Sequence, residues 1–269
     1  MSAEPRAGVL TDILADKRVE VGRLANVRWH PRTASSPRSL RDALRRAAGS
    51  VPLRLIAEIK HRSPSAGPLS RVLDPAARAR AYQEAGASAV SVLCDAKRFD
   101  GSYADLAAVR AAVELPVLCK EFVIDRVQVD RAYDAGADAV LVIVRIVEDD
   151  VSLCSLIDAC EMRGMDALVE VATHEELARA LSAGAHVVGV NARDLDTLAM
   201  DAARAAAVLA AIPPNVIAVH LSGIADPQAV ARVAATRADA ALVGEALMRQ
   251  DDPRPLLRAL VGACGSPAP

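Results

Sequence analysis

An acid and a base separated by one residue stand at the end of the first apolar run of the chain. The run from Leu53 to Ile59 contains Glu58, and Lys60 follows it directly. Because side chains of a β-strand alternate between its two faces, Glu58 and Lys60 are expected on the same face. Opposite charges at the end of an apolar strand are costly to bury for structure alone, but they suit proton transfer beside a bound anion. We therefore expect chemistry at this point.

More polar side chains follow later apolar runs. Lys120 and Glu121 end one such run, Glu170 ends another, and Asn191 and Arg193 follow a third. A single lysine or glutamate of this kind is equally consistent with an ion pair at the rim of the fold. Two lysines and two glutamates that converge would shift one another's pKa values and supply proton donors and acceptors near neutral pH. We predict Lys60, Lys120, Glu58 and Glu170 as the catalytic set.

The last two apolar runs are followed by small residues that suit an anion site. Ser222 and Gly223 follow one run, and Gly244 and Glu245 follow the other. Small residues let backbone N–H groups approach a phosphate closely, although they are also ordinary turn formers. Aromatic residues are scarce, so Phe99 is a candidate to pack on a planar substrate ring. Phe99 is equally consistent with a loop anchor at the rim.

Eight short runs of strand character position these residues, and amphipathic segments of helical length separate them. Three helix-to-strand segments share one pattern, in which an Ala-rich stretch reaches a glycine and a β-branched run begins about three residues later. They are Glu84 to Val92, Asp134 to Val142 and Ser182 to Val190. The expected strands are 53–59, 89–93, 116–120, 139–143, 166–171, 186–190, 215–220 and 239–243.

Strict alternation of eight strands with helices predicts an α/β fold, the (β/α)8 TIM barrel. A doubly wound open sheet is the alternative, but 61–67 lacks the glycine-rich dinucleotide loop that such a sheet favours after its first strand. Two further helices are expected before the barrel, at 8–27 and 39–48. We expect one domain over 1–269, of which about 1–50 is an N-terminal helical extension.

Composition excludes several classes of protein. The chain has 32 Lys and Arg against 34 Asp and Glu, which argues against nucleic acid or an anionic membrane as a partner. We see no signal peptide and no membrane-spanning run. Five cysteines without C-x-x-C spacing indicate neither a disulfide framework nor a zinc site. A cytoplasmic protein is expected.

Several motifs, each short but all in the right order, resemble those of the indole-3-glycerol phosphate synthase family. The resemblance covers about residues 8–262. The motifs are Ile56-Ala-Glu-Ile-Lys60 with Ser63-Pro-Ser65 and Gly67, Phe99-Asp-Gly-Ser102, Pro116-Val-Leu-Cys-Lys-Glu-Phe122, Ala167-Leu-Val-Glu-Val171, Gly189-Val-Asn-Ala-Arg-Asp-Leu195 and Ser222-Gly-Ile224.

The resemblance implies a barrel enzyme that needs neither metal nor organic cofactor. The implied substrate is 1-(2-carboxyphenylamino)-1-deoxyribulose 5-phosphate, which is converted to indole-3-glycerol phosphate, carbon dioxide and water. Lys120 matches the acid for ring closure, Lys60 and Glu170 match the acid and base of dehydration, and Glu58 would hold both lysines charged. A monomer or a weak homo-oligomer is expected.

The same resemblance assigns the remaining site residues. Those matched to substrate binding are Ser63, Pro64, Ser65, Phe99, Asn191, Arg193 and Leu221. Those matched to phosphate binding are Ser222, Gly223, Gly244 and Glu245.

Two of these positions depart from the family pattern. The family usually has Glu immediately before the Ser-Gly of the seventh strand, where this chain has Leu221. By strand parity Leu221 is expected to point into the barrel and His220 toward the helices. Glu245 stands where a small residue is common, and its carboxylate would repel a phosphate unless the side chain turns away.

These departures leave three functional hypotheses. The first is an active synthase, which converts its substrate to a fluorescent indole product without added metal. The second is a catalytically weakened paralogue that binds a phosphorylated ligand or a partner protein, and Leu221 favours it. The third is another phosphosugar enzyme on the same barrel, such as an isomerase, although an isomerase would not need both lysines beside both glutamates.

Overall fold

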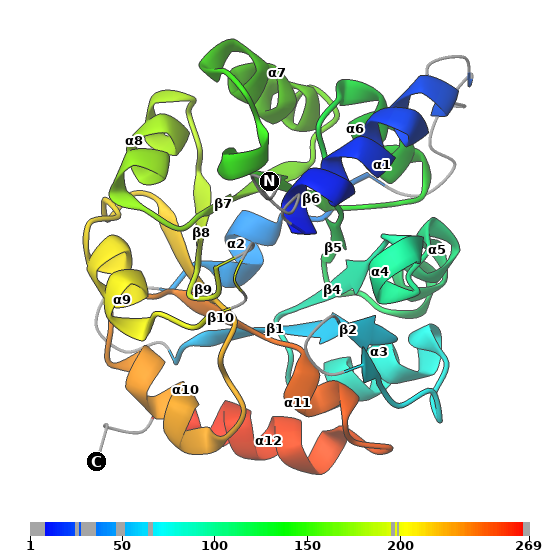
Figure 1. The fold of residues 1–269 in the computed structure, drawn as a ribbon. Helices are drawn as coiled ribbons and strands as arrows, with labels where there is room; N and C mark the ends of the chain where they lie inside the picture. Colours follow the sequence, from blue (N-terminus) through cyan, green and yellow to red (C-terminus); the bar gives the residue numbers. More distant parts are fainter. Residues whose placement is uncertain are drawn as a thin grey trace, which may run out of the picture.

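Eight parallel strands close into a barrel in the computed structural model of the chain, which describes residues 9–24, 27, 36–46, 52–63, 67–194, 197 and 199–265 (Figure 1). Each strand pairs with its neighbours along the chain, and the first pairs with the last. The strands are β1 (Arg54–Ile59), β4 (Ala89–Leu93), β5 (Val117–Lys120), β6 (Ala139–Ile143), β7 (Asp166–Val171), β8 (Val187–Asn191), β9 (Ile217–Leu221) and β10 (Ala240–Val243). The predicted TIM barrel is therefore confirmed.

Helices follow the strands and cover the outside of the barrel (Figure 1). The strands read as near-continuous apolar runs because they are buried on both faces. Aspartate or threonine side chains cap the first turns of most helices, for example Asp74, Asp125 and Thr173. The helices of the barrel are α3 (Pro75–Glu84), α4 (Ala96–Phe99), α5 (Tyr103–Ala112), α6 (Arg126–Asp134), α7 (Asp150–Glu161), α8 (His174–Ser182), α9 (Ala202–Ala210), α10 (Pro227–Ala234), α11 (Glu245–Met248) and α12 (Arg254–Ala263), with a 3-10 turn η1 (Val144–Ile146).

Two helices precede the barrel and contact its opposite ends. In α2 (Leu40–Leu44) the two leucines are fully buried, and backbone N–H groups of Arg38 and Arg41 donate to Asp138 and Asp166 at the amino ends of strands. The helix α1 (Val9–Leu24) instead lies beside α6 at the carboxyl ends (Figure 1). The extension thus closes one end of the barrel and reaches the other.

A buried ion cluster fixes α1 at the carboxyl end. Lys17 Nζ lies 2.9 Å from Asp95 Oδ2, 2.8 Å from Glu121 Oε1 and 2.9 Å from Glu20 Oε2, and its side chain is 4% exposed. Asp95 follows β4 and Glu121 follows β5. A residue of the extension therefore neutralises two carboxylates that follow barrel strands.

The structure differs from expectation in three places. The first helix was expected over 8–27, but α1 ends at Leu24 and Val27 is not helical. The second helix was expected over 39–48 but ends at Leu44, because Arg45 turns to an extended backbone conformation. The loop after β1 contains a short hairpin, β2 (Arg62–Ser63) with β3 (Gly67–Pro68), where only a turn was expected. None of the described helices is both long and apolar enough to cross a membrane.

Candidate active site

A cavity of about 620 Å³ opens at the carboxyl ends of the barrel strands. Its size suits a small organic ligand. The residues predicted for the site that line it are Glu58, Lys60, Ser63, Phe99, Lys120, Glu170, Asn191, Arg193, Ser222, Gly223, Gly244 and Glu245. Leu221 does not line it, and Pro64 and Ser65 lie outside the described residues.

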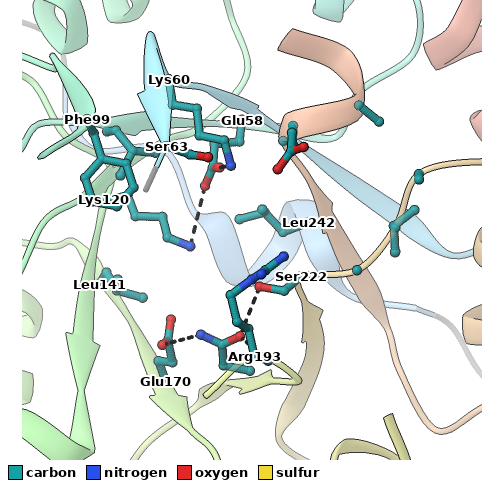
Figure 2. A pocket seen from close by; sticks show the side chains of 18 of the residues that line it. Glu58, Lys60, Ser63, Phe99, Lys120, Leu141, Glu170, Arg193, Ser222 and Leu242 are labelled. Atoms are coloured by element: carbon teal, nitrogen blue, oxygen red, sulfur yellow. Dashed lines mark hydrogen bonds and ion pairs between the residues drawn. The ribbon is translucent and has the colours of Figure 1, made fainter. Parts of the chain in front are cut away.

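One carboxylate joins the two lysines of the site. Glu58 Oε1 lies 2.9 Å from Lys60 Nζ, and Glu58 Oε2 lies 3.5 Å from Lys120 Nζ (Figure 2). Glu58 and Lys60 share a face of β1 as its alternation predicts, and Lys120 reaches them from the end of β5. The longer separation is an ion pair without a strong hydrogen bond, so the Lys120 ammonium keeps donors for a ligand.

Gly244 leaves room for the side chains of Glu58 and Lys60 to pack against the end of the last strand. A Cβ atom at position 244 would lie 2.4 Å from Glu58 Oε1 and 3.1 Å from Lys60 Nζ. Any side chain here would therefore displace the Glu58–Lys60 pair. The glycine brings the acid and base of β1 next to the turn that follows β10.

The charges of this group reinforce one another. Burial raises the pKa of Glu58, but the ammonium groups of Lys60 and Lys120 together lower it below the ordinary carboxyl value. Burial lowers the pKa of Lys120, and the carboxylates of Glu58 and Glu170 together raise it above the ordinary lysine value. At neutral pH Glu58 is a carboxylate and Lys120 is an ammonium ion.

A second hydrogen-bonded group lies across the cavity. Asn191 Nδ2 donates to Glu170 Oε1 at 2.8 Å, and Asn191 Oδ1 accepts from Ser222 Oγ and from the Arg193 backbone N–H, each at 3.0 Å. These contacts fix the orientation of the Asn191 amide. Figure 2 shows Lys120, Glu170 and Arg193 pointing into the same space.

Glu170 differs from Glu58 in the direction of its pKa shift. Burial raises its pKa above the ordinary carboxyl value, and Lys120 and the Asn191 hydrogen bond offset only part of this effect. Two carboxyl groups on one cavity therefore have pKa values moved in opposite directions, which is the arrangement that separates acid and base roles.

The cavity wall between these groups is apolar, and most of it was not predicted from sequence. The rings of Phe99 and Phe122 lie 6.3 Å apart between centroids, at 35°. Leu141 and Leu242 also line the wall, as does Arg249 at its rim. The period-two alternation of the strands was the signal for Leu141 and Leu242. A flat apolar wall beside two ammonium groups suits an aromatic anion.

The model of one protein family, "Indole-3-glycerol phosphate synthase", matches residues 10–260. The chain belongs to the indole-3-glycerol phosphate synthase family. It is 45% identical to the indole-3-glycerol phosphate synthase of Kineococcus radiotolerans over 97% of this chain and 95% of that one. It is 44% identical to that of Mycobacterium avium over 97% of each chain, and 48% identical to that of Micrococcus luteus over 78% of each.

Solved structures of low sequence identity have the same barrel fold as this chain. A 3-hexulose-6-phosphate synthase superposes with a TM-score of 0.62 at 19% identity, covering 78% of this chain and 99% of that one. A thiamine phosphate pyrophosphorylase from Pyrococcus furiosus gives a TM-score of 0.60 at 17% identity, covering 84% of this chain and 97% of that one. At such identities the likeness concerns the fold alone.

Leu221, the unusual residue for an indole-3-glycerol phosphate synthase, lies inside the barrel and below the cavity. Its side chain is fully buried, and a Cβ atom at Gly189 would lie 2.7 Å from Leu221 Cδ1 and 3.2 Å from Leu168 Cδ2. His220 is half-buried on the next position of the strand, and burial lowers its pKa. Leu221 therefore fills space over Gly189, and it adds no polar group to the synthase site.

Glu245, the other departure, turns toward Arg249. Its Oε1 accepts from Arg249 Nη2 at 2.8 Å and from Arg249 Nε at 3.2 Å. The carboxylate is therefore paired within the same short helical segment. Among the residues that the structure describes, no group of three or more His, Cys, Asp or Glu side chains is placed to hold a metal ion.

Proposed function

We propose that Lys120, Lys60, Glu58 and Glu170 carry out the reaction of indole-3-glycerol phosphate synthase in this protein, a carboxy-lyase of tryptophan biosynthesis. The substrate is 1-(2-carboxyphenylamino)-1-deoxyribulose 5-phosphate. The proposal depends on one observation. The Glu58 carboxylate forms ion pairs with the ammonium groups of both Lys60 and Lys120 at the mouth of the barrel. This arrangement places two ammonium groups beside one carboxylate in the same cavity.

Ring closure needs an acid at the ketone. The aromatic carbon that bears the carboxylate attacks the ribulose carbonyl carbon, and the carbonyl oxygen becomes a hydroxyl. Lys120 donates this proton, because its raised pKa keeps it protonated and its 3.5 Å separation from Glu58 leaves donors available. Loss of carbon dioxide then returns the bonding electrons to the ring.

Dehydration needs a second acid and a base. The hydroxyl leaves as water when Lys60 protonates it, and Glu170 accepts the proton that is lost as the indole double bond forms. Glu170 suits a base because its pKa is raised toward neutrality and Asn191 holds its orientation. Phe99 and Phe122 would pack on the aromatic ring, while Ser222, Gly223 and Gly244 line the end where phosphate binds.

Turnover of the purified protein tests the proposal. We expect the wild type to form an indole product, which is measured by its fluorescence. In Lys120→Met we expect kcat to fall by roughly 10²–10⁴-fold. Lys97→Met, a lysine of α4 outside the cavity lining with 67% side-chain exposure, is the matched control. A folded wild-type protein without turnover would favour the weakened paralogue, and turnover of a different phosphosugar would favour the isomerase.

We also propose that the enzyme acts in the cytoplasm as a monomer or weak homo-oligomer. The large exposed apolar residues of the described chain come from separate elements, such as Val19 on α1, Val72 before α3 and Val151 on α7. Single apolar residues of this kind do not form an obligate interface. Sedimentation velocity over a range of concentrations measures the state, and a stable dimer at low concentration would contradict it.

A further inference from the structure

The eight charged residues that line the cavity cancel in formal charge. The acids are Glu58, Glu121, Glu170 and Glu245, and the bases are Lys60, Lys120, Arg193 and Arg249. The proposed substrate brings a phosphate and a carboxylate into this neutral cavity. Each cation therefore matters to binding, and removal of any one would leave a net negative cavity for an anionic ligand.

Arg249 is the cation of the phosphate end that the mechanism has not used. It is the only Lys or Arg among the cavity-lining residues that follow β9 and β10, within the described part of the chain. On the same rim Glu245 carries a negative charge, and Arg249 neutralises it through two donors on one oxygen. A phosphate at this rim would otherwise meet an unpaired carboxylate.

Buried hydrogen bonds hold the backbone on both sides of Arg249, whereas its side chain is exposed to solvent. Arg78 is 1% exposed, and its Nη1 donates to the carbonyl oxygens of Leu247 at 3.2 Å and Gln250 at 3.1 Å. The Arg249 side chain is 56% exposed, and its partner Glu245 is 34% exposed. The guanidinium therefore extends from a rigid turn with freedom to change partner.

Such a change of partner is energetically favourable. An exposed ion pair at i and i+4 contributes little to stability, because solvent screens it and both side chains lose freedom. A guanidinium can instead bind a phosphate through two parallel charge-assisted hydrogen bonds, which are about twice as strong as neutral ones. Resting on the proposed function, we infer that Arg249 is a phosphate-binding residue that Glu245 holds at the rim and releases to the substrate.

The inference fixes the direction in which KM changes in three substitutions. Arg249→Gln removes a phosphate contact and leaves Glu245 unpaired, so KM rises about tenfold while kcat stays within about twofold. Arg249→Lys keeps the charge but loses the paired donors, so its KM lies between the two. Glu245→Gln removes the competitor and the repulsion, so KM falls, and it also lowers KM in the Arg249→Gln background.

The test combines steady-state kinetics with calorimetric titration of inorganic phosphate. Arg254→Gln is the matched control, because Arg254 is 42% exposed, pairs with Asp252 and does not line the cavity. Unchanged KM and phosphate affinity in Arg249→Gln, or a higher KM in Glu245→Gln, would overturn the inference. If the wild type lacks turnover, the phosphate titrations of the same variants still decide it, so failure of the proposed function is recognised separately.

Discussion

At the scale of single residues, the site separates two carboxylates by their surroundings. Glu58 lies between two ammonium groups, whereas Glu170 has one distant cation and an amide. The pKa of Glu58 is lowered and that of Glu170 is raised. We propose that the same side chain is a fixed anion in one place and a proton acceptor in the other.

Glu170 determines the acidic side of the pH profile. As a base it must be ionised, and its raised pKa moves that requirement to a higher pH than for an ordinary carboxyl group. We expect kcat/KM to fall on acidification at a pH above the usual carboxyl range. In Glu170→Gln this limb disappears and kcat falls by roughly 10²–10⁴-fold. A limb that persists in the variant belongs to another group.

Glu170 also links activity to stability. A carboxyl group with a raised folded-state pKa stabilises the fold below its unfolded pKa, and that contribution is lost as the pH rises through the folded value. The ionised form of Glu170 therefore destabilises the fold relative to the protonated form. We expect a higher Tm at pH 7 for the inactive Glu170→Gln variant.

Leu221 tests whether a carboxylate can be restored on the seventh strand. Leu221→Glu places a charge at a fully buried position against Gly189 and Leu168, outside the cavity lining. We expect a loss of about 2 kcal/mol in the free energy of unfolding, measured in urea. Leu221→Met, which keeps the volume, is expected to cost less than about 1.5 kcal/mol. Unchanged stability with higher kcat would mean that the carboxylate reaches the lysines.

The sequence predicted that the charged residues of the proposed catalytic set converge, and the structure places them on one cavity. Lys60, Lys120 and Glu170 lie at the carboxyl ends of apolar strands, and in a parallel barrel those ends meet on one side. Arg249 was missed because it lies on a short helical turn, where an arginine is usually a solvated surface residue. Its one signal was the i, i+4 spacing from Glu245.

At the scale of elements, α1 is bound to the catalytic end by Lys17. Burial lowers the pKa of Lys17, and its carboxylate partners together raise it above the ordinary lysine value. The stabilisation is therefore complete below the ordinary lysine pKa and is lost only as the pH rises through the folded value. The Lys17 contribution therefore persists throughout the neutral range, although burial outweighs Lys17 at Glu121 and leaves the pKa of that carboxyl group raised.

Removal of Lys17 leaves Asp95 and Glu121 buried without a cation. We expect Lys17→Met to lower the free energy of unfolding by about 3 kcal/mol at pH 7, and by less at acidic pH as Glu121, whose pKa is raised by burial, becomes protonated. Arg18→Met is the matched control on the same helix, since the Arg18–Glu148 pair is 60% and 81% exposed. Equal losses in the two variants would contradict a buried role for Lys17.

The elements were predictable to different degrees. All eight strands lie within two residues of their predicted ends, because each is a short buried apolar run, and a glycine precedes β4, β6, β7 and β8. The end of α2 at Leu44 was not foreseen, because the sequence beyond it retains helix-forming alanines. The hairpin of β2 and β3 was hidden because two-residue strands carry no periodicity.

At the scale of the whole molecule, we expect the extension and the barrel to unfold as one domain. Leu44 of α2 and Leu118 of β5 are both fully buried in the same core cluster. Leu44→Ala and Leu118→Ala should each lower the free energy of unfolding by about 2–5 kcal/mol and shift one calorimetric transition. Val72→Ala, at a residue 69% exposed, is the control. A transition that splits in Leu44→Ala would mean that the extension folds separately.

The seam between the first and last strands has a consequence for how the enzyme is made. Arg54 to Ala57 of β1 pair with Ala240 to Val243 of β10, and Gly244 at the end of that seam lies against Glu58. A chain still emerging from the ribosome folds its earlier parts first. Such a chain would already contain both lysines but would lack the turn after β10 that completes the proposed substrate site. We therefore expect activity to appear only when the final strand is in place. We expect a chain truncated before β10 to have no turnover at all, and not merely a lower kcat.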